Sequence, residues 1–257
     1  MLPAVTTAMR QVFKRCLLPA CMAVSVLALT AHAEPTLRLV ADPWPPFTDH
    51  HLPENGLASD VVQQALQRAG YQTHYHEAPW ERAVHGLQRG DYDILINAWY
   101  SEERTGYGAY SSPYLVNRIR VLKRLDHPID FARLQDLYRY RIAAVRGYAY
   151  SAEFDRDPNL QRVGVMGFES AARMLQAGRV DLAVEDEQVA RYHLGPQLDG
   201  LGEPLGFLPQ PLSENPLHIL VRRSRPDHAE ITERFNKALQ SMRADGTYER
   251  ILTRHGH

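Results

Sequence analysis

A seven-residue pattern, Leu-Gln-x-Gly-x-x-Asp, occurs twice in this chain, at 87–93 and at 175–181. In both copies the residues before the glycine have the apolar spacing of a helix, and the residues after the aspartate have the apolar character of a buried strand. One short match could arise by chance, but both copies mark the same helix–glycine–strand corner. The repeat therefore predicts two similar α/β units within one chain, and it constrains the fold more than any other feature of the sequence.

The first half of the chain alternates strand patterns with helix patterns, and the proline-rich stretch 42–47 between the first strand and the first helix must form a loop. An order of strand, helix, strand, helix, strand implies a parallel sheet with helical crossovers. The expected strands are 36–41, 71–76 and 92–97, and the expected helices run from Leu57 up to Gly70 and over 80–89, where Gly90 ends the second helix.

The second half predicts the same alternation. Two extended stretches, 114–122 and 208–221, could link the two units, and the helical pattern from His228 needs a core on which to pack, which the first unit offers. The chain would then cross out once and back once, with two hinge strands beside a cleft. The expected strands here are 141–145, 160–165 and 180–184, and the expected helices are 148–154, 169–176 and 186–193.

The first 33 residues have the pattern of a cleavable export signal. Basic residues precede an apolar run that starts at Cys16, and the run ends in Ala-His-Ala at 31–33. A membrane anchor is the first alternative, but the run is shorter than the roughly 18 to 20 residues that span a bilayer. A lipoprotein with Cys21 as the lipidated residue is the second, but the apolar run continues past Cys21. We expect cleavage after Ala33, which removes both cysteines and leaves a periplasmic protein without a disulfide.

Composition excludes several functions. The formal net charge of -1 offers no electrostatic reason to bind nucleic acid or an anionic membrane. The 12 histidines occur without an HExxH or CxxC spacing, so we expect no metal site. The glycines form neither GxxxxGK[ST] nor GxGxxG, so we expect no nucleotide cofactor. Ser111 and Ser112 lack the setting of a hydrolase triad.

Several motifs, taken together in their order, carry a family resemblance. The chain resembles the bacterial extracellular solute-binding proteins of family 3, which are the periplasmic binding proteins of amino-acid ABC transporters. The resemblance covers nearly the whole chain after the export signal. The motifs are Gly-Leu-Ala-Ser-Asp at 56–60, Leu-Gln-Arg-Gly-Asp-Tyr-Asp at 87–93, Ser-Glu-Glu-Arg at 101–104, Tyr-Ser-Ser-Pro-Tyr at 110–114, Gly-Arg-Val-Asp-Leu-Ala-Val-Glu-Asp at 178–186 and Asp-Gly-Thr-Tyr at 245–248.

The resemblance implies a domain organisation. The fold would be α/β, a two-lobed periplasmic binding protein fold of type 2, in which each lobe is a mostly parallel sheet flanked by helices and two crossover hinge strands join the lobes. The expected segments are the signal peptide at 1–33, the first part of lobe 1 at 34–116, lobe 2 at 117–212, and the return to lobe 1 with the C-terminal helices at 213–257.

The resemblance also implies roles for individual residues. Arg104 would hold the α-carboxylate of the ligand, Asp186 would receive its α-amino group, and an aromatic residue of the loop 42–47 would cover its side chain. A planar guanidinium pairs bidentately with a carboxylate, and a carboxylate pairs with an ammonium group. The candidate ligand-binding residues are Arg104, Asp186, Trp44, Trp99, Asn97, Phe47, Gly147 and Tyr148.

Two departures make the expected site more aromatic than that of a standard amino-acid binder. Trp99 stands where the family usually has a small hydroxyl residue, and in the run Gly147-Tyr-Ala-Tyr150 the residue Ala149 replaces the usual Thr or Ser. Bare N–H groups at the start of the helix expected there could still bind an anion.

Several candidate residues have alternative roles. Arg104 could form a surface ion pair with Glu102 or Glu103, and Asp186 could cap a helix. Trp44 and Trp99 could be core residues, although both are expected in loops at strand ends, and Arg82 could face the cleft or solvent.

The leading functional hypothesis is a monomeric, non-enzymatic binding protein without cofactor or metal. It would capture a small polar ligand, an amino acid or a related carboxylate, for an inner-membrane ABC permease by closure of its two lobes. One alternative is an enzyme similar to the periplasmic cyclohexadienyl dehydratases, which share this fold, with Glu185 or Glu187 as the required carboxylic acid. A second alternative is a sensory binding protein that signals to a membrane receptor.

Overall fold

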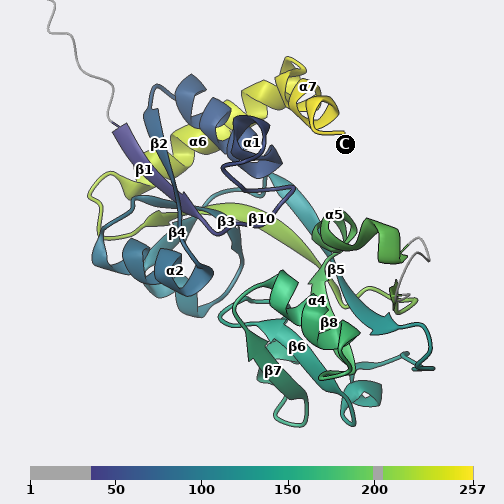
Figure 1. Cartoon of the computed structure of the whole chain (residues 1–257). Coiled ribbons are helices and arrows are strands. Elements are labelled where there is room, and N and C mark those ends of the chain that lie inside the picture. Colours follow the sequence, from purple (N-terminus) through teal and green to yellow (C-terminus); the bar gives the residue numbers. More distant parts are fainter. Residues whose placement is uncertain (1–35, 199–204, 257) are drawn as a thin grey trace, which may run out of the picture. The chain divides into compact units, whose positions relative to one another are not determined.

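The computed structural model describes residues 36–198 and 205–256 (Figure 1). The export signal expected at 1–33, its cleavage site and Cys21 lie outside the described residues. One sheet runs through the described chain in the strand order β2-β1-β3-β10-β5-β8-β6-β7. Its two ends are parallel, and two long antiparallel strands join them, so the predicted two-lobed α/β fold is confirmed.

Lobe 1 contains the end of the sheet where β1 pairs in parallel with both β2 and β3. Lobe 2 repeats this arrangement, because β6 pairs in parallel with both β7 and β8. The strands are β1 Thr36–Ala41, β2 Gln72–Glu77 and β3 Ile94–Trp99 in lobe 1, and β6 Arg141–Val145, β7 Gln161–Val165 and β8 Leu182–Asp186 in lobe 2.

The two crossover strands are β5 (Leu115–Arg124) and β10 (Ser213–Arg222), which pair with each other over 115–119 and 213–217. Beyond this shared section β10 pairs with β3 of lobe 1 and β5 pairs with β8 of lobe 2. The prediction of two extended linking stretches is therefore confirmed. Two three-residue strands that were not predicted, β4 (Gly108–Tyr110) and β9 (Leu205–Phe207), add to β10 and β5.

Helices cover both faces of the lobe 1 sheet (Figure 1). Successive side chains of a strand point to opposite faces, and here both faces carry apolar side chains that pack against helices. In β1, Leu37 and Leu39 join the core beneath the helices α1, α6 and α7, whereas Val40 packs with α2 on the other face. The C-terminal helix α6 packs on α1, as its apolar spacing predicted. The helices are α1 Leu57–Arg68, α2 Trp80–Arg89, α3 Ala152–Arg156, α4 Phe168–Gln176, α5 Glu187–Leu198, α6 His228–Ala244 and α7 Thr247–Arg254, with 3-10 turns η1 Pro53–Asn55, η2 Glu103–Gly106 and η3 Leu134–Leu137.

The repeated seven-residue pattern forms the same corner in both lobes. Asp93 exchanges two bonds with Arg38 at the start of β1: its N–H donates to the Arg38 carbonyl at 2.9 Å, and its carboxylate accepts the Arg38 N–H at 3.0 Å. Asp181 makes the same two bonds with Arg141 at the start of β6, both at 2.9 Å. The glycine of each copy has positive φ, 91° at Gly90 and 64° at 178. The repeat is therefore a structural one, and its aspartate ties the third strand of each lobe to the first.

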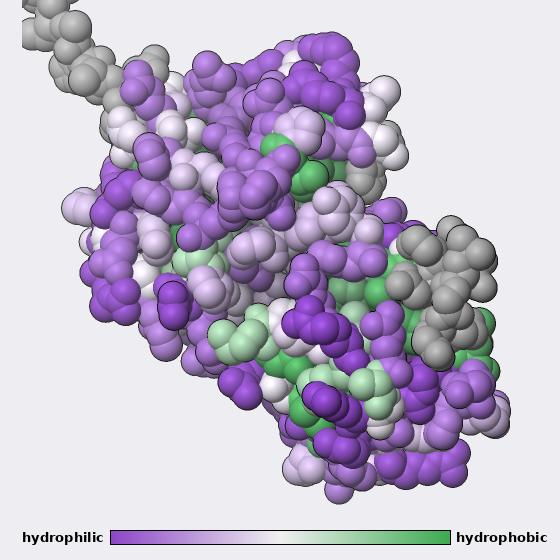
Figure 2. Space-filling model, viewed as in Figure 1, coloured by the Kyte–Doolittle hydropathy of each residue, from purple (hydrophilic) through white to green (hydrophobic). Residues whose placement is uncertain are grey.

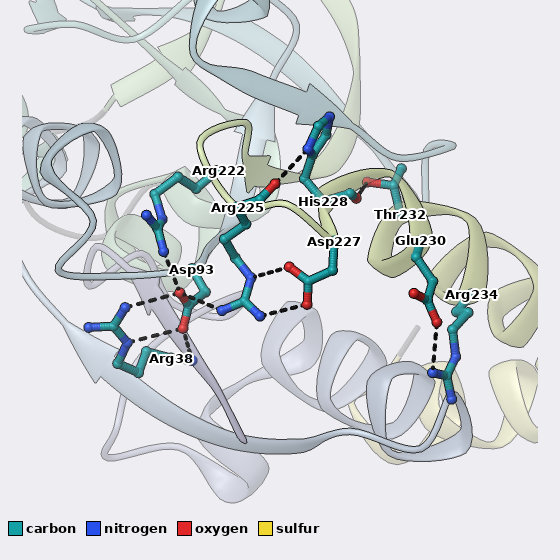
Figure 3. A network of polar contacts seen from close by, with 9 residues as sticks. All are labelled: Arg38, Asp93, Arg222, Arg225, Asp227, His228, Glu230, Thr232 and Arg234. Carbon is teal, nitrogen blue, oxygen red and sulfur yellow. Dashed lines mark hydrogen bonds and ion pairs between the residues drawn. The ribbon is translucent and has the colours of Figure 1, made fainter. Parts of the chain in front are cut away.

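Asp93 differs from Asp181 in being the centre of an arginine network (Figure 3). Its carboxylate is 2% exposed and forms ion pairs with Arg38, Arg222 and Arg225 at 3.0 to 3.1 Å. These residues come from β1, from the end of β10 and from the turn before α6. The network therefore fastens the return segment of the chain to the first strands of lobe 1.

Several predicted boundaries were wrong: the strand expected at 92–97 covers 94–99, the helix expected at 186–193 covers 187–198, and two further differences have a clear local cause. The helix expected over 148–154 begins only at Ala152, because the Ser151 side chain caps it by accepting the Phe154 N–H, while Tyr148 and Tyr150 contact other parts of the chain. The strand expected at 180–184 continues to Asp186, whose neighbour in β5 is Ile119.

Hydrophilic residues cover most of the face shown in Figure 2, and hydrophobic residues form small separate patches on it. Among the residues that the structure describes, no helix combines the length and the apolar character needed to cross a membrane.

Candidate functional site

A small cavity lies between the two lobes, next to the crossover strands. Its volume is about 10 Å³, close to the smallest space that holds a single water molecule. A solvent-open groove with walls from both lobes continues from it. The lining residues are Trp44, Trp80, Asn97, Trp99 and Arg104 of lobe 1 and Tyr148 and Ala149 of lobe 2.

Arg104 lies in η2 and is only 6% exposed. Its Nη1 donates to the Trp99 carbonyl at 2.8 Å, and its Nη2 donates across the interface to the Gly147 carbonyl at 2.7 Å. The guanidinium also lies over the Trp80 ring, 4.9 Å from the centroid. The alternative of a surface ion pair is wrong, because Glu102 pairs with Arg156 instead. Arg104 therefore places a buried cation at the boundary of the lobes.

The carbonyl of Gly147, rather than its N–H group, faces lobe 1. It accepts a second hydrogen bond from Trp80 Nε1 at 2.8 Å. The helix expected from 148 begins only at Ala152, so the N–H groups of residues 147–150 do not lie at a helix start, as the expected anion site required. Gly147 has φ 73°, a conformation that residues with a side chain rarely adopt, and a Cβ there would lie 3.2 Å from the Trp80 ring. Both the backbone conformation and the close contact therefore favour glycine at this position.

Asp186 ends β8 and is almost fully buried. Its Oδ1 accepts the N–H groups of Gln188 and Val189 at 2.8 and 3.1 Å, so the alternative role as the cap of α5 is confirmed. Its Oδ2 accepts Asn117 Nδ2 and the Arg118 N–H, both at 3.2 Å. Burial raises the pKa of Asp186 to about 6 although these hydrogen bonds oppose the shift.

The aromatic residues expected at the cleft lie together, at the meeting point of the lobes. Trp44 contacts Phe47 at 4.6 Å between ring centroids and Trp99 edge-on at 5.5 Å, and Trp99 contacts Tyr148 at 5.4 Å. Trp99 is the last residue of β3, paired with Leu217, so its expected place in a loop was wrong. Both tryptophans are buried and also line the cavity, so the core role and the cleft role coincide.

Two polar bridges join the aromatic residues to buried side chains. Trp99 Nε1 donates to Asn117 Oδ1 at 2.9 Å, and Asn117 in turn donates to Asp186. Tyr148 donates its hydroxyl to Asp42 Oδ2 across the interface at 2.6 Å. Asn97 Nδ2 donates to the other oxygen of Asp42 at 2.8 Å, while Asn97 Oδ1 is buried and has no partner among the described residues. Trp99 therefore supplies a hydrogen-bond donor at one position where a hydroxyl residue was expected, and Tyr148 supplies one beside Ala149, which stands at the other.

Sequence reasoning considered Glu185 only as a catalytic acid and missed its position. Its side chain is fully buried in lobe 2, and its Oε1 accepts Trp44 Nε1 from lobe 1 at 3.0 Å and the Asp186 N–H at 2.8 Å. Its Oε2 is buried and has no hydrogen-bond partner in the part of the chain that the structure describes. Burial, with Asp186 and Asp42 nearby, raises the pKa of Glu185 to about 8, so the carboxyl group is mostly protonated at neutral pH.

Not every predicted residue reaches the cavity. Phe47 lies behind Trp44, and Asp186 lies behind Asn117. Arg82 is exposed and lines neither the cavity nor the groove. Trp80 and Asp42 were missed, although Asp42 follows the first strand, where ligand sites of open parallel sheets lie. Glu187 pairs with Arg120 and Arg191; burial alone would raise its pKa, but these arginines lower it.

One group of side chains in the described chain could offer several metal ligands. Asp49, His50 and His51 place their ligand atoms within 4.8 Å of one another in the loop after Thr48. Both histidine rings already contact carboxylates, Glu77 and Asp49, and both are largely exposed. The group is outside the interlobe cavity.

Comparison with known proteins identifies relatives along nearly the whole described chain. The sequence profile of the bacterial extracellular solute-binding proteins, family 3, matches residues 37–257. The ABC transporter arginine-binding protein 1 of Escherichia coli (strain K12) is 26% identical over 200 residues, which are 76% of this chain and 79% of the relative.

Solved structures share the fold at lower identity. An ancestral arginine-binding protein bound to arginine is 24% identical, with a TM-score of 0.73, over 85% of this chain and 97% of its own. An ancestral amino acid-binding protein described as a precursor of cyclohexadienyl dehydratase is 22% identical, with a TM-score of 0.69, over 85% of this chain and 94% of its own.

Proposed function

The chain belongs to the bacterial extracellular solute-binding proteins, family 3, and on that premise we propose that it captures an amino acid or a related carboxylate between its lobes for delivery to an ABC permease. The observation that carries the proposal is the buried Arg104 guanidinium, which projects from lobe 1 and donates to a backbone carbonyl of lobe 2. The Arg104 guanidinium can exchange this neutral acceptor, the Gly147 carbonyl, for the charged carboxylate of a ligand.

Arg104 is the proposed carboxylate clamp. A ligand carboxylate between the lobes would replace the Gly147 carbonyl as the acceptor for Nη2, and hydrogen bonds between ionised partners are stronger than those to a neutral carbonyl. The bond from Nη1 to the Trp99 carbonyl and the Trp80 ring beneath the guanidinium would hold the side chain in place during this exchange. Positioning of the cation before the ligand arrives lowers the entropic cost of binding.

Asp186 is the proposed partner of the ligand's α-amino group, from lobe 2. Asp186 already accepts four hydrogen bonds, about as many as a carboxylate has lone pairs, so the ammonium group would replace Asn117 Nδ2, whose bond to Oδ2 is 3.2 Å long. A zwitterion held by Arg104 and Asp186 would bridge the lobes, because the two residues belong to opposite sides.

Binding would require the lobes to part and close again. The cavity holds about one water molecule, so an amino acid enters only after the lobes separate. We propose that lobe 1 comprises 34–116 and 213–257 and lobe 2 comprises 117–212, with bending at β5 and β10 where the two strands pair. Closure around the ligand would then present the joined surface of the two lobes to the permease.

Calorimetry on single-site variants tests the clamp. Arg104→Ala should weaken the binding of an amino acid by roughly 30-fold to a few thousand-fold, because the loss of one partner of a desolvated charge pair costs about 2 to 5 kcal/mol. Asp186→Asn should act similarly on amino acids and little on carboxylates that lack an amine. Arg82→Ala, on the exposed face of α2, is the matched control. Unchanged binding by Arg104→Ala would refute the clamp.

Export to the periplasm is part of the proposal, since the relative from Escherichia coli is a component of an ABC transporter. The secreted protein should begin at Glu34, which mass spectrometry of a periplasmic extract checks. An acylated Cys21 or a retained segment 1–33 would contradict the expected cleavage.

An enzyme on the same scaffold is the second candidate, and one observation favours it. Glu185 is a buried carboxyl group that is mostly protonated at neutral pH, as a general acid must be, whereas Glu187 is paired with arginines and stays ionised. Trp44 covers Glu185, however, and Glu185 does not line the cavity. Incubation with prephenate or arogenate separates the candidates, because an enzyme forms product and a binding protein only saturates.

A further inference from the structure

Three carboxyl groups are buried at the boundary of the lobes: Asp42 from lobe 1, and Glu185 and Asp186 from lobe 2. Glu185 feels the negative charge of both others, so the three groups form one cluster. In the part of the chain that the structure describes, none of the three forms an ion pair with a basic side chain. Their hydrogen-bond donors are neutral: Tyr148 and Asn97 at Asp42, Trp44 at Glu185, and Asn117 with backbone N–H groups at Asp186.

Buried carboxylates without a cation are costly, since desolvation penalises the charged form. This cost is visible in the acid–base behaviour of the cluster, because burial raises the pKa of all three carboxyl groups. Among the described residues, two buried oxygens there, Glu185 Oε2 and Asn97 Oδ1, also have no hydrogen-bond partner. Unpartnered buried polar atoms are rare in folded proteins. Here Asn97 lines the interlobe cavity, and Glu185 is bonded to Trp44, which also lines it.

Two of the hydrogen bonds to these carboxyl groups join opposite lobes. Trp44 of lobe 1 donates to Glu185 of lobe 2, and Tyr148 of lobe 2 donates to Asp42 of lobe 1. Separation of the lobes therefore breaks both bonds at once and leaves Asp42 and Glu185 facing the gap. A group that enters the gap meets acceptors on both sides.

We infer that the ligand of the proposed site carries a second positive charge, an ammonium or guanidinium group on its side chain, which Asp42 and Glu185 hold between the lobes. This inference rests on the proposed function and deepens it. Arg104 and Asp186 would hold the α-carboxylate and the α-amino group, so Asp42 and Glu185 remain for the side chain. A guanidinium has five N–H donors and an ammonium group three, enough to reach Asp42 together with the unpartnered oxygens of Glu185 and Asn97.

A cation beside Glu185 favours its ionised form, which predicts a measurable proton release. At pH 7 the carboxyl group holds a proton before binding, because its pKa is raised to about 8. An adjacent cation lowers that pKa, and the proton leaves to the buffer.

The experiment compares amino acids that match in shape and differ in charge. Arginine against citrulline and lysine against norleucine are titrated into the exported form of the chain by calorimetry, in two buffers of different ionisation enthalpy at pH 7. We expect the cationic member of each pair to bind about 30-fold more tightly or better, with release of up to one proton. Glu185→Gln should reduce the preference and abolish the proton release, and Asp42→Asn should also reduce the preference. Glu169→Gln, the same change at an exposed position of α4, is the matched control.

The outcomes separate this inference from the proposed function. If citrulline binds as tightly as arginine, or if Glu185→Gln leaves the preference unchanged, the cation subsite is refuted while amino-acid capture stands. If no amino acid binds but a diamine such as putrescine does, and does so through Glu185, the cation subsite stands and amino-acid capture falls. Thermal melting of each variant confirms that a loss of binding does not arise from unfolding.

Discussion

Replacement of Asp93 by asparagine should destabilise the fold far more than the same change at Asp181, the equivalent residue of the repeated pattern. Each carboxylate accepts a backbone N–H from the first strand of its lobe, that of Arg38 or that of Arg141, and an asparagine oxygen can still accept it. Asp93 alone also accepts side-chain hydrogen bonds from Arg38, Arg222 and Arg225 (Figure 3). The comparison therefore isolates the arginine network from the backbone corner.

The magnitude follows from burial and charge. Removal of the anion from a buried ion-pair cluster leaves three arginines facing each other around a neutral amide, and such losses cost about 3 to 5 kcal/mol. Arg38 is 43% exposed, and solvent screens part of its interaction, so we expect the lower end, about 3 kcal/mol. Asp181 is half-buried and forms no ion pair among the described residues, so Asp181→Asn should cost less than about 1 kcal/mol.

Urea unfolding of both variants at several pH values measures these differences. Burial alone would raise the pKa of Asp93, but hydrogen bonds from Arg38, Arg225 and Arg222 outweigh it and lower the pKa well below its usual range. A lowered folded-state pKa stabilises the protein at pH values above the unfolded pKa of about 4 and loses that contribution as the pH falls further. The gap between the parent and Asp93→Asn should thus be constant from pH 5 to 8 and shrink below pH 4. Equal costs for the two variants, or a gap that persists undiminished at pH 3, would refute this reasoning.

Two further predictions concern the turn before α1 and the contact between the lobes. Gly56→Ala should lower the melting temperature by at least roughly 2 to 4 °C, because φ is 94° there and a Cβ would lie 2.6 Å from the Phe47 carbonyl oxygen. Gly106→Ala should leave the melting temperature unchanged, because a Cβ there meets no atom within 4 Å, and equal melting temperatures for the two variants would contradict this. Tyr148→Phe should enlarge the radius of gyration in small-angle scattering, because it removes the hydroxyl that joins lobe 2 to Asp42, and saturating ligand should reverse the change. Tyr138→Phe loses a similar bond to Asp157 within lobe 2, so it should leave the radius unchanged, and a similar effect of both variants would argue against interlobe control.

Local patterns predicted the elements whose boundaries local chemistry determines. The helix at 80–89 was predicted to the residue, because Gly90 adopts the left-handed conformation that ends it. The strand at 36–41 was also predicted correctly, from the alternation of its side chains. Elements with too few residues to show a period, such as β4 and β9, were missed because they exist only by pairing with β10 and β5.

Some residues that line the cavity were predicted from the sequence, but their connections were not. The positions of Trp44, Trp99 and Arg104 near strand ends indicated the cavity, and all three line it. Their partners could not be predicted, because the bonds from Trp44 to Glu185 and from Tyr148 to Asp42 join residues 141 and 106 positions apart and depend on how the lobes meet. No periodicity or turn signal encodes that contact.

The two departures from the family pattern explain why the lobes can meet so closely. Trp99, at one position where a hydroxyl residue was expected, and Tyr148, beside Ala149 at the other, extend N–H and O–H donors on large rings to Asn117 and Asp42. The rings fill the space between the lobes, and the donors satisfy polar groups that a ligand would otherwise reach. Opening breaks only a few interlobe hydrogen bonds and ring contacts, while β5 and β10 keep their backbone pairing. A ligand must therefore form more favourable contacts than these few interlobe bonds provide. On our proposal it does so with positively charged groups that pair with the buried carboxyl groups.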